Sequence, residues 1–164
     1  MDMNKARWLV VSILVLAALT YLWRLAPDFL DQRSGDGVAY QTGTVPADCH
    51  IQAAGCRIEV PGVGVLLVTM PDKIIPLERF EFTVRPEPEV AQEIGEIVVD
   101  FDMTEMDMGV NRYTLTREHT DVYRQTVVLP ICTATETDWI AQLFITSTQG
   151  HYRYDFDFVM QPPR

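Results

Sequence analysis

Apolar and polar residues alternate along much of the chain between residues 57 and 160. In the last such segment, HYRYDFDFVM (151–160), aromatic residues and a methionine occupy one face and mostly charged residues the other. A period of two is typical of a β-strand with one buried and one solvated face. Seven more segments have strand character, namely 57–60, 64–70, 79–84, 96–103, 112–116, 122–129 and 138–148. Seven or eight short strands separated by turn residues predict an all-β domain, an antiparallel β-sandwich.

One apolar run near the N-terminus lacks this alternation. Residues 8–23, WLVVSILVLAALTYLW, contain no charge. As a helix that rises about 1.5 Å per residue, the stretch 6–26 would cover roughly 31 Å, which matches the hydrocarbon core of a bilayer. Arg7 and Arg24 near its ends can extend their charges toward water. The run therefore predicts one N-terminal transmembrane helix.

A cleaved signal peptide and a buried core helix are the alternatives for this run. Signal peptidase sites follow small residues, whereas the run ends in TYLWR (20–24). Positive charges at Lys5 and Arg7 favour a cytoplasmic N-terminus, with the rest of the chain on the other side of the membrane. We therefore expect residues 1–26 to form a short cytoplasmic tail and an uncleaved signal anchor.

The composition divides the chain into three parts. After the anchor, residues 27–48 are polar and rich in glycine, without a sustained period, which is typical of a linker. Residues 49–164 hold all the predicted strands and form one domain. The net charge is −10, and because residues 1–26 hold three basic residues and one acidic residue, the remainder carries about −12. Nucleic acids attract clustered Lys and Arg, so a nucleic-acid-binding function is excluded.

The chain has three cysteines. Cys49 and Cys56 are separated by six residues in CHIQAAGC, and the compartment expected for this domain is oxidising. A disulfide that closes this short loop would stabilise the domain by about 2.5 kcal/mol. A metal or redox pair is the alternative, but those motifs use shorter spacings. We expect a Cys49–Cys56 disulfide, which leaves Cys132 unpaired.

The sequence contains no GxSxG, HExxH, phosphate-binding or dinucleotide-binding motif. Its three histidines, at 50, 119 and 151, are far apart in the sequence. An enzyme is therefore not expected. The acids at 100, 102, 105 and 107 suggest a calcium site, because hard cations bind clustered carboxylates. Strand alternation, however, directs Asp100 and Asp102 outward, so a solvated face is the favoured interpretation.

Three methionines, Met103, Met106 and Met108, lie within six residues at the end of a predicted strand. Met103 is in phase with apolar residues of that strand, which predicts a core position. Met106 and Met108 are two residues apart, so an extended backbone would direct both sulfurs the same way. Thioethers are good ligands for Cu(I), and a thiolate or an imidazole can complete the coordination. Cys132 and His119 are the candidate further ligands of such a copper site.

Four segments carry a resemblance to a known group of proteins: the C-x6-C opening (49–56), MDMGVNRYTL (106–115), LPIC (129–132) and the DW pair (138–139). Together they resemble membrane-anchored periplasmic proteins of Gram-negative bacteria that are related to FixH-like and YtkA-like domains. The resemblance implies an immunoglobulin-like sandwich, an inner-membrane location and a role beside copper delivery and cytochrome oxidase assembly factors. It points to Met106, Met108, Gly109, Asn111 and Cys132 as shared features.

Two functions follow from these patterns. In the first, the periplasmic domain binds copper, or assists a partner that does, with Met106, Met108, Cys132 and His119 as ligands. In the second, no metal is bound, and MDMGVNRY (106–113) with LPIC (129–132) forms a sulfur-rich apolar patch that docks a membrane or periplasmic protein partner. The expected contact residues are Met106, Met108, Asn111 and Tyr113. Copper is the one cofactor expected.

Overall fold

The computed structural model describes residues 38–52, 54–87, 94–104, 108–119, 122–131 and 138–161, together with Leu16 and Met106. The chain divides into two compact units, Met1–Val38 and Ala39–Arg164. The predicted membrane helix, except for Leu16, and the first half of the predicted linker (27–37) lie outside the described residues. Leu16 is helical and exposed. The described residues by themselves contain no helix that is long enough and apolar enough to cross a bilayer.

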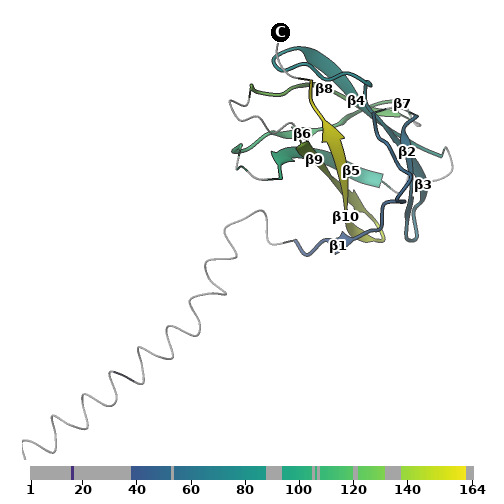
Figure 1. Cartoon of the computed structure of the whole chain (residues 1–164). Helices are drawn as coiled ribbons and strands as arrows, with labels where there is room; N and C mark the ends of the chain where they lie inside the picture. Colours follow the sequence, from purple (N-terminus) through teal and green to yellow (C-terminus); the bar gives the residue numbers. More distant parts are fainter. Residues whose placement is uncertain are drawn as a thin grey trace, which may run out of the picture. The chain divides into compact units, whose positions relative to one another are not determined.

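Two five-stranded sheets make up the second unit (Figure 1). The first sheet has the order β1 (Gln41–Thr42), β10 (Gly150–Val159), β9 (Asp138–Ser147), β5 (Ile94–Met103) and β6 (Arg112–Thr114). The second has the order β2 (Cys56–Val60), β3 (Gly64–Thr69), β4 (Arg79–Pro86), β8 (Val122–Val128) and β7 (Thr116–His119). Neighbouring strands are antiparallel except β1 and β10, which are parallel. The predicted all-β sandwich is confirmed.

The described residues contain ten strands, in place of the predicted seven or eight. One addition is β1, whose two residues are too few to give a sequence pattern and lie in the predicted linker. The other comes from the predicted strand 112–116, which divides at Leu115. On one side β6 pairs with β5 in the first sheet, and on the other β7 pairs with β8 in the second. Leu115 is buried, so the chain changes sheets where an apolar side chain anchors it.

The core lies between the sheets and follows the predicted alternation. In β10 all the residues of the predicted inner face are buried, namely Tyr152, Tyr154, Phe156 and Phe158, with Met160 just beyond the strand. Met103 is also buried, as predicted from its phase. Phe101 occupies the centre, where its ring meets four others edge-on at centroid distances of 5.8–6.1 Å, those of Phe80, Phe82, Tyr113 and Phe158. Burial of these large side chains is the main stabilising term.

Two tyrosine hydroxyls connect the sheets by hydrogen bonds. Tyr152 donates to the carbonyl of Pro61 at 2.9 Å, and Tyr154 donates to the carbonyl of Glu59 at 2.7 Å. Both acceptors lie at or just after the end of β2 in the second sheet. The chain passes so closely over the Tyr154 ring at Gly43 that a β-carbon there would overlap it. Glycine is therefore required at residue 43, just after β1.

Candidate functional site

The loop between β5 and β6, which we call the methionine loop, holds Met106 and Met108, and side-chain hydrogen bonds connect several of its described residues. Asp102 accepts at Oδ1 from the backbone N–H of Met103 at 2.8 Å and of Met108 at 3.5 Å. Asn111 donates from Nδ2 to the carbonyl of Met108 at 3.2 Å. Gly109 has a φ of 71°, which a residue with a side chain rarely adopts. Asp102 and Asn111 thus hold a turn that depends on Gly109.

The structure places the predicted copper ligands in different surroundings. Met106 is 43% exposed, whereas Met108 is partly buried against the core. Cys132 and the side chain of His119 lie outside the described residues. The backbone of His119 pairs with Val122 at the start of β8, the end of the sandwich opposite the β5–β6 loop. His119 is therefore not brought together with Met106 and Met108.

No group of three or more His, Cys, Asp or Glu suited to a metal ion occurs in the described part of the domain. The two acids of β5 that alternation directs outward have other partners. Asp100 lies 3.7 Å from Arg112, and its burial raises its pKa while the arginine opposes that shift. Asp102 binds backbone N–H groups of the methionine loop. Both carboxylates therefore contribute to local structure.

Asn111 and Tyr113, the other residues of the predicted docking surface, are half-buried. The Asn111 side chain closes the methionine loop. Tyr113 donates its hydroxyl proton to the carbonyl of Val128 at 2.7 Å, and its ring contacts Phe101. The polar atoms of both side chains are thus used within the fold. Of the four residues, Met106 is the one with a largely exposed side chain.

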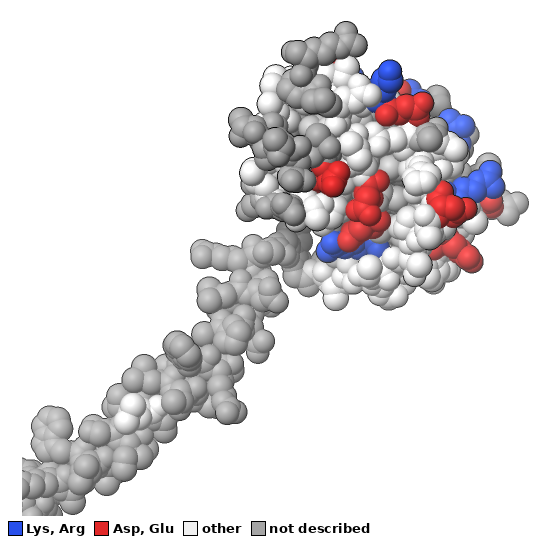
Figure 2. Space-filling model, in the orientation of Figure 1, with Lys and Arg blue, Asp and Glu red and all other residues white. Residues whose placement is uncertain are grey.

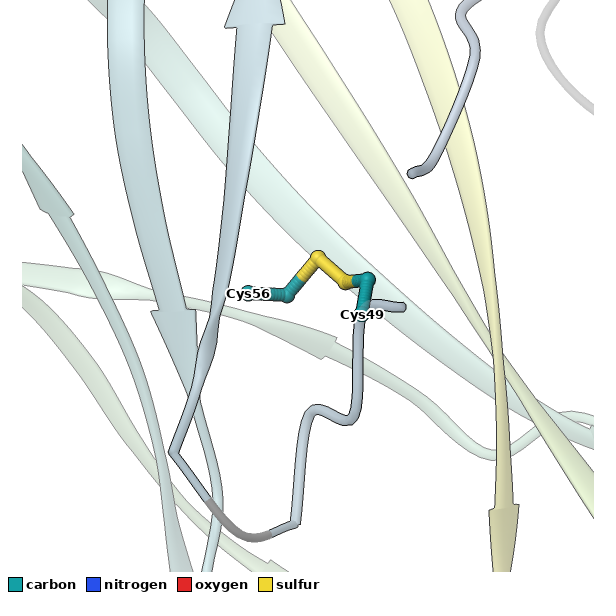
Figure 3. Close-up of a disulfide and its surroundings, with 2 residues drawn as sticks. All are labelled: Cys49 and Cys56. Carbon is teal, nitrogen blue, oxygen red and sulfur yellow. A yellow bond between two sulfur atoms is a disulfide. The ribbon is translucent and has the colours of Figure 1, made fainter. Parts of the chain in front are cut away.

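The predicted disulfide between Cys49 and Cys56 is confirmed (Figure 3). Their α-carbons are 5.1 Å apart, within the range that disulfides require. Inside the closed loop, Gln52 donates from Nε2 to the carbonyl of Val159 at 2.9 Å and accepts from its N–H at 3.1 Å. The Gln52 amide thereby pairs with the backbone at the end of β10. The disulfide loop precedes β2 of the second sheet and binds the first sheet.

Loss of this disulfide is expected to lower the free energy of unfolding by about 2.5 kcal/mol, because an open loop gains conformational freedom mainly in the unfolded chain. The measurement is urea denaturation of the double variant Cys49→Ser with Cys56→Ser, beside Cys132→Ser as the matched control. The control should unfold at nearly the wild-type urea concentration. Equal stability of the double variant and the wild type would contradict this account of the loop.

Five large apolar side chains are exposed at one end of the sandwich. They are Leu77 (61%), Met106 (43%), Val110 (88%), Ile131 (45%) and Val159 (52%). Strand pairing places them at the same end: the start of β4 lies beside the end of β8, and the end of β5 lies beside the start of β9 and, through β9, the end of β10. A hydrogen bond from Gln161 to Ile74 joins these two groups. We call this the apolar end.

Leu77 differs from the other four because its backbone is strained. Its φ is 63°, and it is the one non-glycine residue with positive φ in the described part of the chain. A hydrogen bond from its N–H to the carbonyl of Leu129, at 2.9 Å, holds it there. This conformation costs a residue with a β-carbon on the order of 1 kcal/mol. Leu77 thus combines backbone strain with apolar exposure.

Leu77→Gly is expected to be more stable than Leu77→Ala by about 1 kcal/mol, because glycine adopts positive φ without a steric penalty. At Val110, which is not in this conformation, the order should be reversed, since glycine loses more entropy on folding. Urea denaturation of the four variants measures both differences. A Leu77→Ala protein that is more stable than Leu77→Gly would show that the leucine backbone carries no strain.

Charged residues on the domain surface are mixed in sign, as Figure 2 shows by the red and blue side chains that lie beside each other. Arg153 binds Asp155 through two hydrogen bonds of 2.8 and 2.7 Å. Arg112 and Arg153 also lie over the ring of Phe144, at 5.0 and 5.9 Å from its centroid. Arg112 and Arg153 therefore interact with side chains on their own sheet face. Compared with this charged face, the apolar end is the more distinctive surface.

The sequence patterns did not single out Leu77 or Val159, whereas Val110 and Ile131 lie in MDMGVNRY (106–113) and LPIC (129–132), the two segments predicted to form an apolar docking patch. A usable signal exists for three of these four residues. Leu77, Val110 and Ile131 each directly follow a proline or a glycine, in Pro76-Leu77, Gly109-Val110 and Pro130-Ile131. Turn residues of this kind are normally polar. Val159 is the last residue of β10 and points outward. Its sequence position gives no signal that it is exposed at the apolar end.

No protein-family model matches this chain, and a search of the curated proteins also finds no match. The resemblance to FixH-like and YtkA-like domains therefore stays a prediction.

Proposed function

We propose that this protein is a membrane-anchored accessory protein of the periplasm that docks a protein partner through its apolar end. The observation that carries the proposal is the set of five exposed apolar side chains at one end of the sandwich, which includes the strained Leu77. Exposed apolar groups that gather at one place are typical of interaction sites. The described residues offer no comparable group of large apolar side chains at the opposite end.

The path of the chain suits this role. Gln41 in β1 pairs with Tyr152 near the start of β10, whereas Val159 of the apolar end closes the same strand. The chain therefore enters the sandwich at the end opposite the apolar end. An anchor formed by residues 1–26 would leave the docking loops at the far end from its point of attachment.

An immunoglobulin-like topology is part of the proposal. In immunoglobulin domains, strands A, B, E and D form one sheet and strands C, F and G form the other. The order β3-β4-β8-β7 corresponds to the first sheet, and β5-β9-β10 corresponds to the second, with β6 added beside β5. Variable domains of this class bind their targets with loops at one end of the sandwich. In this correspondence the B–C and F–G loops are β4–β5 and β9–β10, at the end opposite the apolar end, so the topology supports the fold class and leaves the choice of docking end to the exposed apolar residues.

Residue chemistry supports the periplasmic location. A disulfide persists in oxidising compartments and is rare in the cytosol. The apolar run 8–23 with Lys5 and Arg7 before it is typical of a signal anchor with a cytoplasmic N-terminus. The acidic remainder of the chain keeps a tethered domain soluble.

Site-specific photo-crosslinking in intact membranes tests the docking proposal. A photoreactive residue is placed at Val110 or at Gln149, an exposed residue in the β9–β10 turn at the opposite end. We expect one discrete adduct with another protein from position 110 and none from 149, and we expect Ile131→Asp to remove the adduct. An adduct that persists with Ile131→Asp, equal labelling from position 149, or an adduct with the mass of two copies of this chain would overturn the proposal.

Copper handling is the second candidate, because Met106 is exposed in the same loop as Met108. The backbone of Met108 is held by hydrogen bonds with Asp102 and Asn111. Ile131, also at the apolar end, directly precedes Cys132 in the sequence. Two thioethers and one thiolate form a ligand set that suits Cu(I). In this version the partner is a copper protein or an oxidase assembly factor, and the apolar end transfers or protects the metal.

Titration of the full chain with Cu(I) tests the second candidate. Near-stoichiometric binding should be lost in the double variant Met106→Leu with Met108→Leu and in Cys132→Ser, whereas His119→Ala should bind as the wild type does. Leucine preserves the apolar character of the loop, so the double variant should still give the Val110 crosslink. If the double variant binds Cu(I) normally, or the wild type binds none, copper is not held at this loop.

A further inference from the structure

The first sheet ends at β6 in an edge whose backbone is open. Just before this strand the carbonyl of Asn111 accepts from a β5 N–H at 3.1 Å, and just after it the N–H of Leu115 donates to a β5 carbonyl at 2.9 Å. Successive residues of a paired strand direct their backbone groups to opposite sides, so those of Arg112 and Thr114 point away from β5. Both residues are exposed. No other strand of the described sheets pairs with this side of β6.

The other three sheet edges are closed, interrupted or shorter. In β2 the carbonyl of Glu59 accepts the hydroxyl proton of Tyr154 from the opposite sheet. In β7 the register shifts between Arg117 and His119, and an irregularity of this kind blunts an edge. The edge strand β1 has only two residues. The pairing of β6 with β5 is regular, so β6 is the edge of the described sheets that best accepts another strand.

The open edge continues into the apolar end. Val110, which is 88% exposed, lies two residues before Arg112 in the same segment. Along the edge, Arg112 and Thr114 project from the outer face of the sheet, whereas Tyr113 projects inward and is half-buried against Phe101. A strand added here would place apolar side chains beside the Tyr113 ring and polar ones beside Arg112.

We infer that the docked partner contributes an extended segment, which pairs with β6 and adds a strand to the first sheet. Its backbone bonds the open N–H and carbonyl groups of Arg112 and Thr114, and its neighbouring residues cover Val110. In this mode of recognition the backbone bonds provide affinity and the alternate side chains provide specificity. The inference rests on the proposed docking function, because it names the form in which the partner is recognised.

A proline at an open backbone position tests the strand pairing. Proline has no N–H, and an edge strand tolerates it where the N–H faces solvent. Thr114→Pro therefore removes an open donor and leaves the ladder between β5 and β6 in place. Arg57→Pro in β2 is the matched control, because Glu59, two residues on, directs its carbonyl away from β3 to Tyr154. Both variants should keep nearly the wild-type unfolding midpoint in urea.

The first readout is the photo-crosslink from Val110 in intact membranes. We expect Thr114→Pro to reduce the adduct about tenfold or more, and Arg57→Pro to leave it unchanged. An undiminished adduct with a folded Thr114→Pro protein would overturn the inference. An adduct with the mass of two copies of this chain would overturn both the inference and the docking proposal.

Hydrogen exchange in the wild-type chain is the second readout and needs no variant. The full chain in detergent micelles is followed by NMR. In the free protein the N–H groups of Arg112 and Thr114 should exchange fast, while that of Leu115 exchanges slowly. The purified partner captured at position 110 should slow exchange at residues 112 and 114 by about tenfold or more. Unchanged exchange at both would contradict strand addition even if Thr114→Pro does not fold.

The outcomes separate this inference from the docking proposal. If the adduct depends on Ile131 but not on Thr114→Pro, docking stands and strand addition fails. If the adduct is lost with Thr114→Pro but persists with Ile131→Asp, the partner pairs with β6 and docking through the apolar end fails. The absence of any adduct from position 110 would overturn both.

Discussion

Phe101→Ala is expected to lower the free energy of unfolding by about 4 kcal/mol, because it leaves a cavity at the centre of the sandwich. The Phe101 side chain is fully buried, and its ring contacts four aromatic rings that come from both sheets. Each edge-on ring pair adds stabilisation beyond the burial of area. The neighbouring strands cannot close the space without losing the register of β5 with β9.

The measurement for Phe101 is urea denaturation followed by circular dichroism. Phe144→Ala is the matched control, because Phe144 lies on the outer face of β9 and is only half-buried. Its loss removes contacts with Arg112 and Arg153 and should cost clearly less. If the two alanine variants lose the same stability, the core is not centred on Phe101.

Raising the pH from 10 to 12 is expected to destabilise the domain by about 2 kcal/mol through Tyr154 alone. Burial of this fully enclosed phenol is the main cause that raises its pKa to about 12, from 10 in an unfolded chain. Between these values the unfolded chain releases the proton and the folded chain keeps it. Stability is therefore unaffected well below pH 10, begins to fall as the pH approaches 10, and falls further as the pH rises toward 12.

Unfolding curves at pH 8, 10, 11 and 12 measure this loss, with Tyr154→Phe as the variant. The variant should be less stable than the wild type at pH 8 by about 1 kcal/mol, since it lacks the hydrogen bond to the Glu59 carbonyl. Its further loss between pH 10 and 12 should be smaller than that of the wild type. Burial also raises the pKa of Tyr123, so some alkaline destabilisation remains. An unchanged pH dependence would contradict the assignment to Tyr154.

The sequence predicted those parts of the fold that depend on local patterns. The inner face of β10 and the buried position of Met103 follow from a period of two, which a folded sheet preserves. The disulfide follows from the short spacing of Cys49 and Cys56. The change of sheet at Leu115 was not predictable, because one apolar residue between two short strands has the same pattern whether the chain stays in a sheet or crosses over.

The candidate site shows the same division between local and long-range information. Sulfur chemistry alone drew attention to Met106, which is exposed, and to Met108, which packs against the core. The roles of Asp102 and Asn111 in closing the methionine loop depend on a turn that no spacing rule describes. The apolar end joins Leu77, Val110 and Val159 from distant segments, so it exists only once the strand order is known.

Affinity for the partner captured at position 110 tests the docking claim most directly. The full chain in detergent micelles is titrated with that purified partner, as wild type, as the double variant Val110→Asp with Ile131→Asp, and as Gln149→Asp. Because the altered side chains are exposed, all three proteins should have nearly the same unfolding midpoint. We predict that the double variant binds at least about tenfold more weakly and that Gln149→Asp binds as the wild type does. Equal affinity of the double variant and the wild type would contradict docking through the apolar end.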